Sequence, residues 1–75
     1  MTEQIARVCY VVHRPGDTKP ITQSWVSESA ARAQACTIVR VQDERKGRRH
    51  DGYLTWADLR RRRYYSAQAT MVWYR

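Results

Sequence analysis

The chain has 75 residues, enough for one domain, and a domain of this size buries only about 60% of the surface that it exposes when unfolded. Its hydrophobic fraction of 43%, with few Gly and Pro, indicates a folded rather than a disordered chain. The net charge is +7, and twelve of the fourteen basic residues are Arg. Guanidinium groups bind phosphate and carboxylate through paired hydrogen bonds and stack on flat rings. The composition therefore favours a protein that binds a polyanion or an acidic surface.

The cysteines and the apolar runs bear on where the chain acts. Cys9 and Cys36 are too few for a disulfide framework, and no basic stretch followed by an apolar segment opens the chain, so we do not expect secretion. The longest apolar runs, such as Val8 to Val12, are about a quarter of the roughly 20 residues that span a bilayer. We expect a cytoplasmic protein without a membrane partner.

The first part of the chain has the pattern of a β-hairpin. Residues Ile5–Val12 are rich in β-branched and aromatic side chains, and both alternating sets are apolar, which predicts a central strand. Arg14–Asp17 predicts a type II turn, because Pro fixes φ at its second position and Gly accepts a positive φ at its third. Ile21–Val26 predicts the returning strand, with Pro20 at its start.

A helix is predicted over Glu28–Val41. Ser27 can cap its first turn, Glu28 lies at the positive end of the helix dipole, and four alanines follow. Residues 37–41, β-branched at all but Arg40, suit a strand equally well, but we favour the helix because it gives an apolar stripe that can pack on the sheet. That stripe is Ala31, Ala35, Ile38 and Val41.

The segment Asp43–Gly52 is polar and without periodicity, so it predicts a mobile basic loop. A short second helix follows. Thr55 can cap it, with Asp58 reaching back to complete a capping box, and Leu54 can pack on Leu59 across the cap.

The last segment, Tyr64–Tyr74, alternates with a period of two and predicts a final, half-buried strand. Together these elements predict a single α+β domain over residues 1–75. It consists of a small antiparallel sheet with one packed amphipathic helix and a short second helix.

Two basic stretches are candidate binding segments. The Arg run at 60–63, followed by two tyrosines, has the composition of a surface for single-stranded nucleic acid. Four consecutive helical residues span about 300°, so not all four can face one ligand. The alternative for this run is a solvated helix whose arginine stems cover apolar surface. The basic loop at 45–50 also has two interpretations: it contacts phosphates, or it is only solvated. The candidate partner or nucleic-acid binding residues are Arg45, Lys46, Arg48, Arg49, Arg60, Arg61, Arg63 and Tyr64.

No pattern in the sequence indicates catalysis or metal binding. Cys9, Cys36, His13 and His50 lack the spacing of a zinc site, and no nucleophile stands beside a base in a recognisable motif. We therefore expect no enzymatic activity, no metal and no cofactor, with both cysteines acting as small buried hydrophobes.

The large aromatics allow two interpretations. Trp25, Trp56 and Trp73 are expected to form the core, because the chain has few Leu and no Phe. The alternative is that some of them are exposed and form a protein-binding surface, since Trp, Tyr and Arg are enriched at the centres of such surfaces.

A small, Arg-rich chain of this kind resembles the host-takeover proteins of bacterial viruses. In length and basic character it is similar to the small RNA-polymerase-binding transcription regulators of Xanthomonas phages. That resemblance implies docking on bacterial RNA polymerase near the RNA exit channel, in the host cytoplasm, with inhibition of initiation and antitermination. Two alternatives remain: an anti-CRISPR inhibitor, although many such inhibitors are acidic, and a small basic nucleic-acid-binding module, although recognition signatures are missing.

Overall fold

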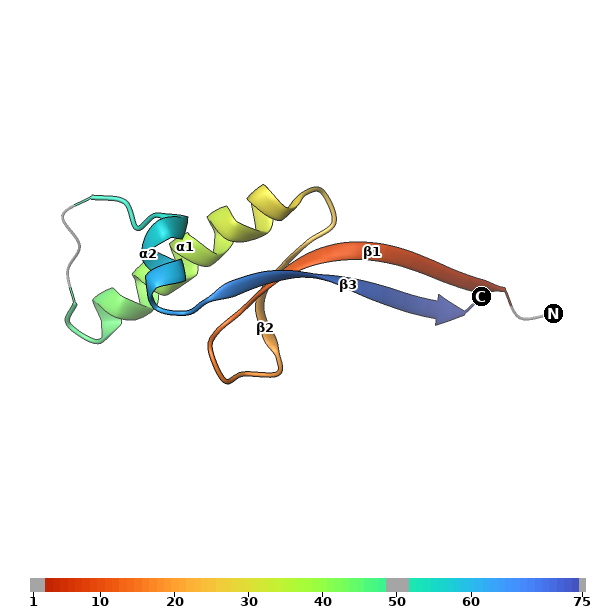
Figure 1. Ribbon diagram of the computed structural model, residues 1–75, viewed down its shortest axis with the longest axis horizontal. Helices are drawn as coiled ribbons and strands as arrows, with labels where there is room; N and C mark the ends of the chain where they lie inside the picture. Colours follow the sequence, from red (N-terminus) through yellow and green to blue (C-terminus); the bar gives the residue numbers. More distant parts are fainter. Residues whose placement is uncertain (1–2, 49–51, 75) are drawn as a thin grey trace.

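The computed structural model describes residues 3–48 and 52–74 and has the predicted α+β architecture (Figure 1). The expectations for Arg49, His50 and Asp51 lie outside the described residues. In chain order the elements are β1 (Gln4–His13), β2 (Pro20–Ser24), α1 (Glu28–Arg45), α2 (Trp56–Arg61) and β3 (Tyr65–Tyr74). One long helix, one short helix and an antiparallel sheet were all predicted, and all are present.

The three strands form one antiparallel sheet in the order β2-β1-β3, so β1 is the central strand as predicted. β1 pairs with β3 over its whole length, from Gln4 opposite Tyr74 to His13 opposite Tyr65. β2 pairs with β1 only between Tyr10 and His13. The sheet therefore continues beyond the helices as two strands, which gives the molecule its extents of 55 × 20 × 18 Å (Figure 1).

We call this two-stranded extension the arm: Gln4–Val8 of β1 paired with Thr70–Tyr74 of β3. Figure 1 shows it leading away from both helices. The other end of the molecule contains the rest of the sheet, which we call the sheet body, with α1 packed on it and α2 packed against α1.

The predicted hairpin turn is confirmed. The backbone N–H of Asp17 donates to the carbonyl of Arg14 over 3.1 Å, and Gly16 has a φ of 82°, as a type II turn requires at its third position. β2 begins at Pro20, as expected, but ends at Ser24, two residues before the predicted end. Its Thr22 hydroxyl donates to the carbonyl of Ala31 over 3.0 Å, which fixes β2 to α1.

Helix α1 begins where predicted and is longer than predicted. The Ser27 hydroxyl accepts the backbone N–H of Ala30, and the helix continues to Arg45, so the first three residues of the predicted loop are helical. The buried side chains recur every four residues, at Ala31, Ala35, Val39 and Asp43. The predicted stripe is therefore wrong in its second half, because the helix turns Val39 toward the core and leaves Val41 41% exposed.

The core lies between α1, the sheet body and the segment around α2. It consists of Val12, Ala31, Ala35, Val39, Leu54 and Leu59. The expectation that the three tryptophans form the core is wrong: Trp25 and Trp73 are each 40% exposed, and Trp56 only packs at the margin. The reason is that α1 faces the sheet with two alanines, which bring helix and sheet close together and leave no room for an indole in a close-packed interior.

Helix α2 begins with the predicted capping box. The backbone N–H of Asp58 donates to the Thr55 hydroxyl over 3.3 Å, and the Asp58 carboxylate accepts the Thr55 N–H over 2.9 Å. Leu54 and Leu59 are both buried in the same cluster, as the predicted packing across the cap requires. Within the described part of the chain, no helix combines the length and the apolar character needed to cross a bilayer.

Candidate functional site: a basic cluster where two helices end

The carboxyl ends of α1 and α2 lie together at the end of the molecule opposite the arm tip (Figure 1). An ion pair joins them: Arg62 Nη1 lies 2.7 Å from Oδ2 of Asp43, whose side chain is 8% exposed. Asp43 belongs to the last turns of α1 and Arg62 is the residue after α2. Two basic stretches that are separate in the sequence are therefore neighbours in the fold.

The end of α1 is a well-formed Schellman cap. Gly47 has a φ of 83°, and its N–H donates to the carbonyl of Glu44 over 3.0 Å. The N–H of Arg48 donates to the carbonyl of Asp43 over 2.8 Å. These two bonds satisfy carbonyls that would otherwise have no partner at the helix end. Gly47 thus ends α1 within the segment predicted to be a mobile loop, and the backbone of Lys46 and Arg48 has a defined position.

Helix α2 ends in the same way, with one difference. The N–H of Arg63 donates to the carbonyl of Arg60 over 2.9 Å, and the N–H of Tyr64 donates to that of Leu59 over 3.0 Å. Arg63 takes the place that Gly47 has in α1, with a φ of 66°, which side chains other than Gly rarely adopt. The cap fixes where the chain leaves α2 and enters β3.

The four arginines at 60–63 differ in their surroundings, as their helical spread predicted. Arg62 is turned inward to Asp43. Arg61 reaches Oδ1 of Asp58 at 3.3 Å, but its side chain is 80% exposed. Arg60 and Arg63 are exposed. Only part of the run therefore remains for a ligand.

We call the exposed basic residues at these two helix ends the basic cluster: Arg45, Lys46, Arg48, Arg60, Arg61 and Arg63. Except for Arg61, none of them forms an ion pair with another residue in the ranges 3–48 and 52–74. Arg49, the remaining basic residue predicted for this site, lies outside the described ranges.

Among the residues that the structure describes, the acidic side chains at this end are already engaged. Asp43 contacts Arg62, and Glu44 accepts from Nε of Arg40 over 3.3 Å. Asp58 accepts from the Thr55 backbone N–H and hydroxyl, which lowers the pKa of its carboxyl, and Arg61 and Arg62 lower it further. Within the described ranges the basic cluster therefore keeps a net positive field.

The predicted partner residue Tyr64 is half-buried and packs against the core, with the Arg14 guanidinium 6.0 Å from its ring centre. The next residue, Tyr65, is 47% exposed and stacks on His13 with ring centres 5.0 Å apart. Tyr64 precedes β3 and packs against the core, whereas Tyr65 begins β3 and packs on His13. Only part of the Tyr64 ring is open to a ligand beside the basic cluster.

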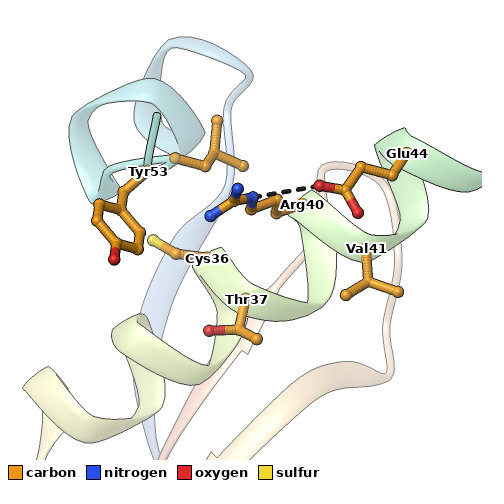
Figure 2. A pocket seen from close by; sticks show the side chains of 7 residues that line it. Cys36, Thr37, Arg40, Val41, Glu44 and Tyr53 are labelled. Atoms are coloured by element: carbon orange, nitrogen blue, oxygen red, sulfur yellow. Dashed lines mark hydrogen bonds and ion pairs between the residues drawn. The ribbon is translucent and has the colours of Figure 1, made fainter. Parts of the chain in front are cut away.

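A pocket of about 430 Å³ lies between α1 and the segment before α2 (Figure 2). Its lining residues are Cys36, Thr37, Arg40, Val41, Glu44, Tyr53 and Leu54. Figure 2 shows Arg40 reaching across it, paired with Glu44. The Arg40 guanidinium also lies 5.5 Å from the Tyr53 ring centre.

The pocket does not hold an activated nucleophile. Partial burial raises the pKa of the Cys36 thiol, and the negative charge of Asp58 raises it further. The thiol is therefore protonated at neutral pH, whereas the thiolate is the reactive form. Among the described residues, no three His, Cys, Asp or Glu side chains gather as metal ligands would.

A second surface lies on the arm, and its exposed tryptophans fit the alternative to a tryptophan core, although the sequence did not show where they gather. Trp25 and Trp73 meet edge to face with ring centres 6.2 Å apart, and the Arg7 guanidinium lies 4.9 Å from the Trp25 ring centre. Met71, on the same face, is 42% exposed. The signal that could have revealed this surface is the absence of any charged residue between 65 and 74.

Comparison with known proteins gives no relative: no family model, no curated protein and no solved structure matches the chain.

Proposed function

We propose that this chain binds a phosphate-rich polymer, RNA or DNA, through the basic cluster. The observation that supports this most directly is that two capped helices end side by side, with exposed guanidinium and ammonium groups of which only Arg61 has an acidic partner in the described ranges. Desolvated contacts between such groups and phosphate oxygens are charge-assisted and strong.

The expected mode of binding is contact with the polymer backbone. The basic cluster offers several cations, and Tyr64, the ring that follows it directly in the chain, is half-buried. Phosphate contacts provide affinity and position, while sequence is read through base edges and stacking. We therefore expect little sequence preference and a steep loss of affinity with salt, with a slope of roughly −0.7 to −0.9 per phosphate contacted.

The narrower form of the proposal concerns transcription. The chain's likeness in length and charge to small polymerase-binding phage regulators supports bacterial RNA polymerase as the site of action, with emerging RNA as the polyanion. A positive surface suits the exit channel because RNA phosphates and acidic protein surfaces converge there, and complementary charge speeds encounter.

Anisotropy of a labelled single-stranded RNA, titrated with the protein at several salt concentrations, tests the general proposal. Lys46→Ser and Lys19→Ser form a matched pair: both remove one exposed lysine, but only Lys46 belongs to the basic cluster. Lys46→Ser should weaken binding several-fold and lower the salt slope by about one phosphate contact. Lys19→Ser should change the affinity less than twofold.

The triple variant Arg45→Ser, Lys46→Ser, Arg48→Ser should lose tenfold or more. Equal losses for Lys46→Ser and Lys19→Ser would contradict a localised site, because they would show that only net charge matters. Absence of binding at low salt would contradict nucleic-acid binding altogether.

The narrower proposal has its own assay. Purified bacterial RNA polymerase is supplied with a template that carries a promoter and an intrinsic terminator, with and without the protein. Reduced initiation together with increased read-through would support it, and the triple variant should lose both effects. No change in either product, with RNA binding intact, would leave the chain as a nucleic-acid-binding module that does not act on polymerase.

A further inference from the structure

Strand β3 is an edge strand without the usual features that prevent pairing with another chain. It is ten residues long, lies at the edge of the sheet, and contains no charged residue, Pro or Gly, although 28% of the chain is charged. Natural edge strands are normally kept from pairing with other chains by charges, prolines, bulges or short length. β3 has none of these protections, and within the described residues it pairs with β1 alone.

The arm to which β3 contributes has little packed over it: Trp25 contacts Trp73 on one face, and the other face is open. Along one face of the arm Val8 is 49% exposed, Val72 45% and Tyr74 66%. A two-stranded ribbon is at best marginally stable in water, and a third strand or a packing layer is what normally stabilises it. Because β2 already stops opposite Tyr10, the described part of the chain supplies no third strand there, and the packing reported over the arm is that of Trp25 on Trp73.

We propose that the missing strand is the β3 of a second copy, and this proposal does not depend on the proposed function. Two β3 strands paired antiparallel about a twofold axis would join two three-stranded sheets into one of six strands, in the order β2-β1-β3-β3-β1-β2. Such a contact is isologous and closes on itself, so it gives dimers and not fibres.

The distribution of charge favours this arrangement. Each copy has a net charge of +7, so two copies repel unless their basic clusters are far apart. Antiparallel pairing places the arm tip of one copy beside the sheet body of the other, which puts the two basic clusters at opposite ends. A ten-residue strand spans about 33 Å, roughly four times the screening length of about 8 Å at physiological salt.

The other open edge of the arm, on β1, is less suitable. It contains Arg7, whose guanidinium lies over the Trp25 ring, and its continuation from Tyr10 is already occupied by β2. A strand added to β1 could pair only over the short stretch before Tyr10, beside the Arg7 charge and the Trp25 indole. The β3 edge is uncharged along all ten residues.

The area at this edge indicates a reversible dimer. A strip about 33 Å long and about 10 Å deep gives roughly 330 Å² for each copy, or about 700 Å² in total. This value lies below the roughly 1,200 Å² at which stable interfaces begin and within the range of weak, transient contacts. We therefore expect dissociation in the micromolar range.

Sedimentation of nuclease-treated protein over the micromolar range tests the proposal with a matched pair of variants. Val8 and Thr70 are cross-strand neighbours, and both side chains are exposed, but only Thr70 belongs to β3. The wild-type protein should shift from monomer to dimer with concentration. Thr70→Lys places two like charges near the twofold axis and should weaken the dimer tenfold or more, while Val8→Lys should leave the dimer within about threefold.

Three outcomes would overturn the proposal: a wild-type monomer throughout the range, an unchanged dimer in Thr70→Lys, or equal weakening by both variants, which would indicate face packing or the β1 edge. Circular dichroism of both variants checks that the sheet is intact. Amide exchange in residues 70–74 gives a second readout, because protection there should increase with protein concentration. The Thr70→Lys variant should still bind RNA as a monomer. Measuring its RNA binding therefore separates a failure of the dimer proposal from a failure of the proposed function.

Discussion

Arg62 and Asp43, nineteen positions apart, form the ion pair that holds the ends of the two helices together. Its partners are unequally exposed, at 33% for Arg62 and 8% for Asp43, so removing the arginine leaves a mostly buried carboxylate without this partner. Arg62 therefore differs from its neighbours in the arginine run: its role is in stability, whereas Arg60 and Arg63 remain available to a ligand.

We expect Arg62→Ala to lower the free energy of unfolding by about 1–3 kcal/mol, below the 3–5 kcal/mol of fully buried pairs because one partner is partly solvated. Arg60→Ala is the matched control and should change it by no more than about 0.5 kcal/mol. Urea denaturation measures both values. In RNA binding the order should reverse, with Arg60→Ala causing the larger loss. Equal destabilisation by the two variants would contradict the separate roles.

The two helix caps predict opposite effects of glycine. Arg63→Gly should raise the free energy of unfolding by about 0.5–1 kcal/mol, because glycine adopts the positive φ of 66° without strain. Gly47→Ala should lower the free energy of unfolding by about 1 kcal/mol, because alanine is strained at a φ of 83°. The loss comes from the backbone alone, since no neighbouring atom lies within 4 Å of the added methyl. Thermal melts would show whether the signs are opposite. A destabilising Arg63→Gly would contradict the role assigned to the α2 cap.

Asp58 predicts an acid-dependent contribution to stability. Hydrogen bonds from Thr55 lower the pKa of this carboxyl in the folded state, so the contribution is complete above the ordinary carboxyl pKa. It is lost as the pH falls through the lowered folded pKa. Asp58→Asn should therefore melt at a lower temperature than wild type at pH 7, and the difference should shrink in strong acid. A difference that is constant with pH would rule out the carboxylate as its source.

Val39 and Val41 predict unequal losses of stability in one helix. Val39 is 1% exposed and Val41 41% exposed. Val39→Ala should cost about 2 kcal/mol, from the lost transfer free energy of two methyl groups and the cavity left behind. Val41→Ala should cost no more than about 0.5 kcal/mol. Chemical denaturation of the two variants compares them directly. Equal losses would place the core-facing side of α1 elsewhere.

Features that depend on neighbouring residues were predictable from the sequence. The type II turn at Gly16, the cap at Ser27 and the capping box of Thr55 and Asp58 are each set by side chains within four positions. The long alternation of β3 was equally local, and it predicted that strand to within one residue.

Features that depend on tertiary packing were not predictable in the same way. Val39 and Val41 are both apolar, and only the packing beside Leu54 and Leu59 decides which of them is buried. Trp25 and Trp73 are exposed because the two-stranded arm extends beyond the helices. The sequence could not show this, because the strands of an exposed ribbon and of a buried sheet have the same alternation of side chains.

The candidate site was partly predictable. Charge density alone identified both basic stretches, including Arg48 and Arg60. That Asp43 and Arg62 bring these stretches together could not be predicted, since the contact depends on how α2 packs against α1. The position of Tyr64 at the margin of the core has the same cause.

The ladder between β1 and β3 also determines the order in which the chain can fold. Its outermost register pair joins residue 4 to residue 74, so almost the whole described chain must be looped before that pair can form. Contacts so distant in sequence close slowly because the loop entropy is lost before any contact energy is gained. The hairpin of β1 and β2 and the first turns of α1 need only local closure and can form earlier. During synthesis β1 leaves the ribosome long before its partner, so the arm must be the last part of the fold to assemble.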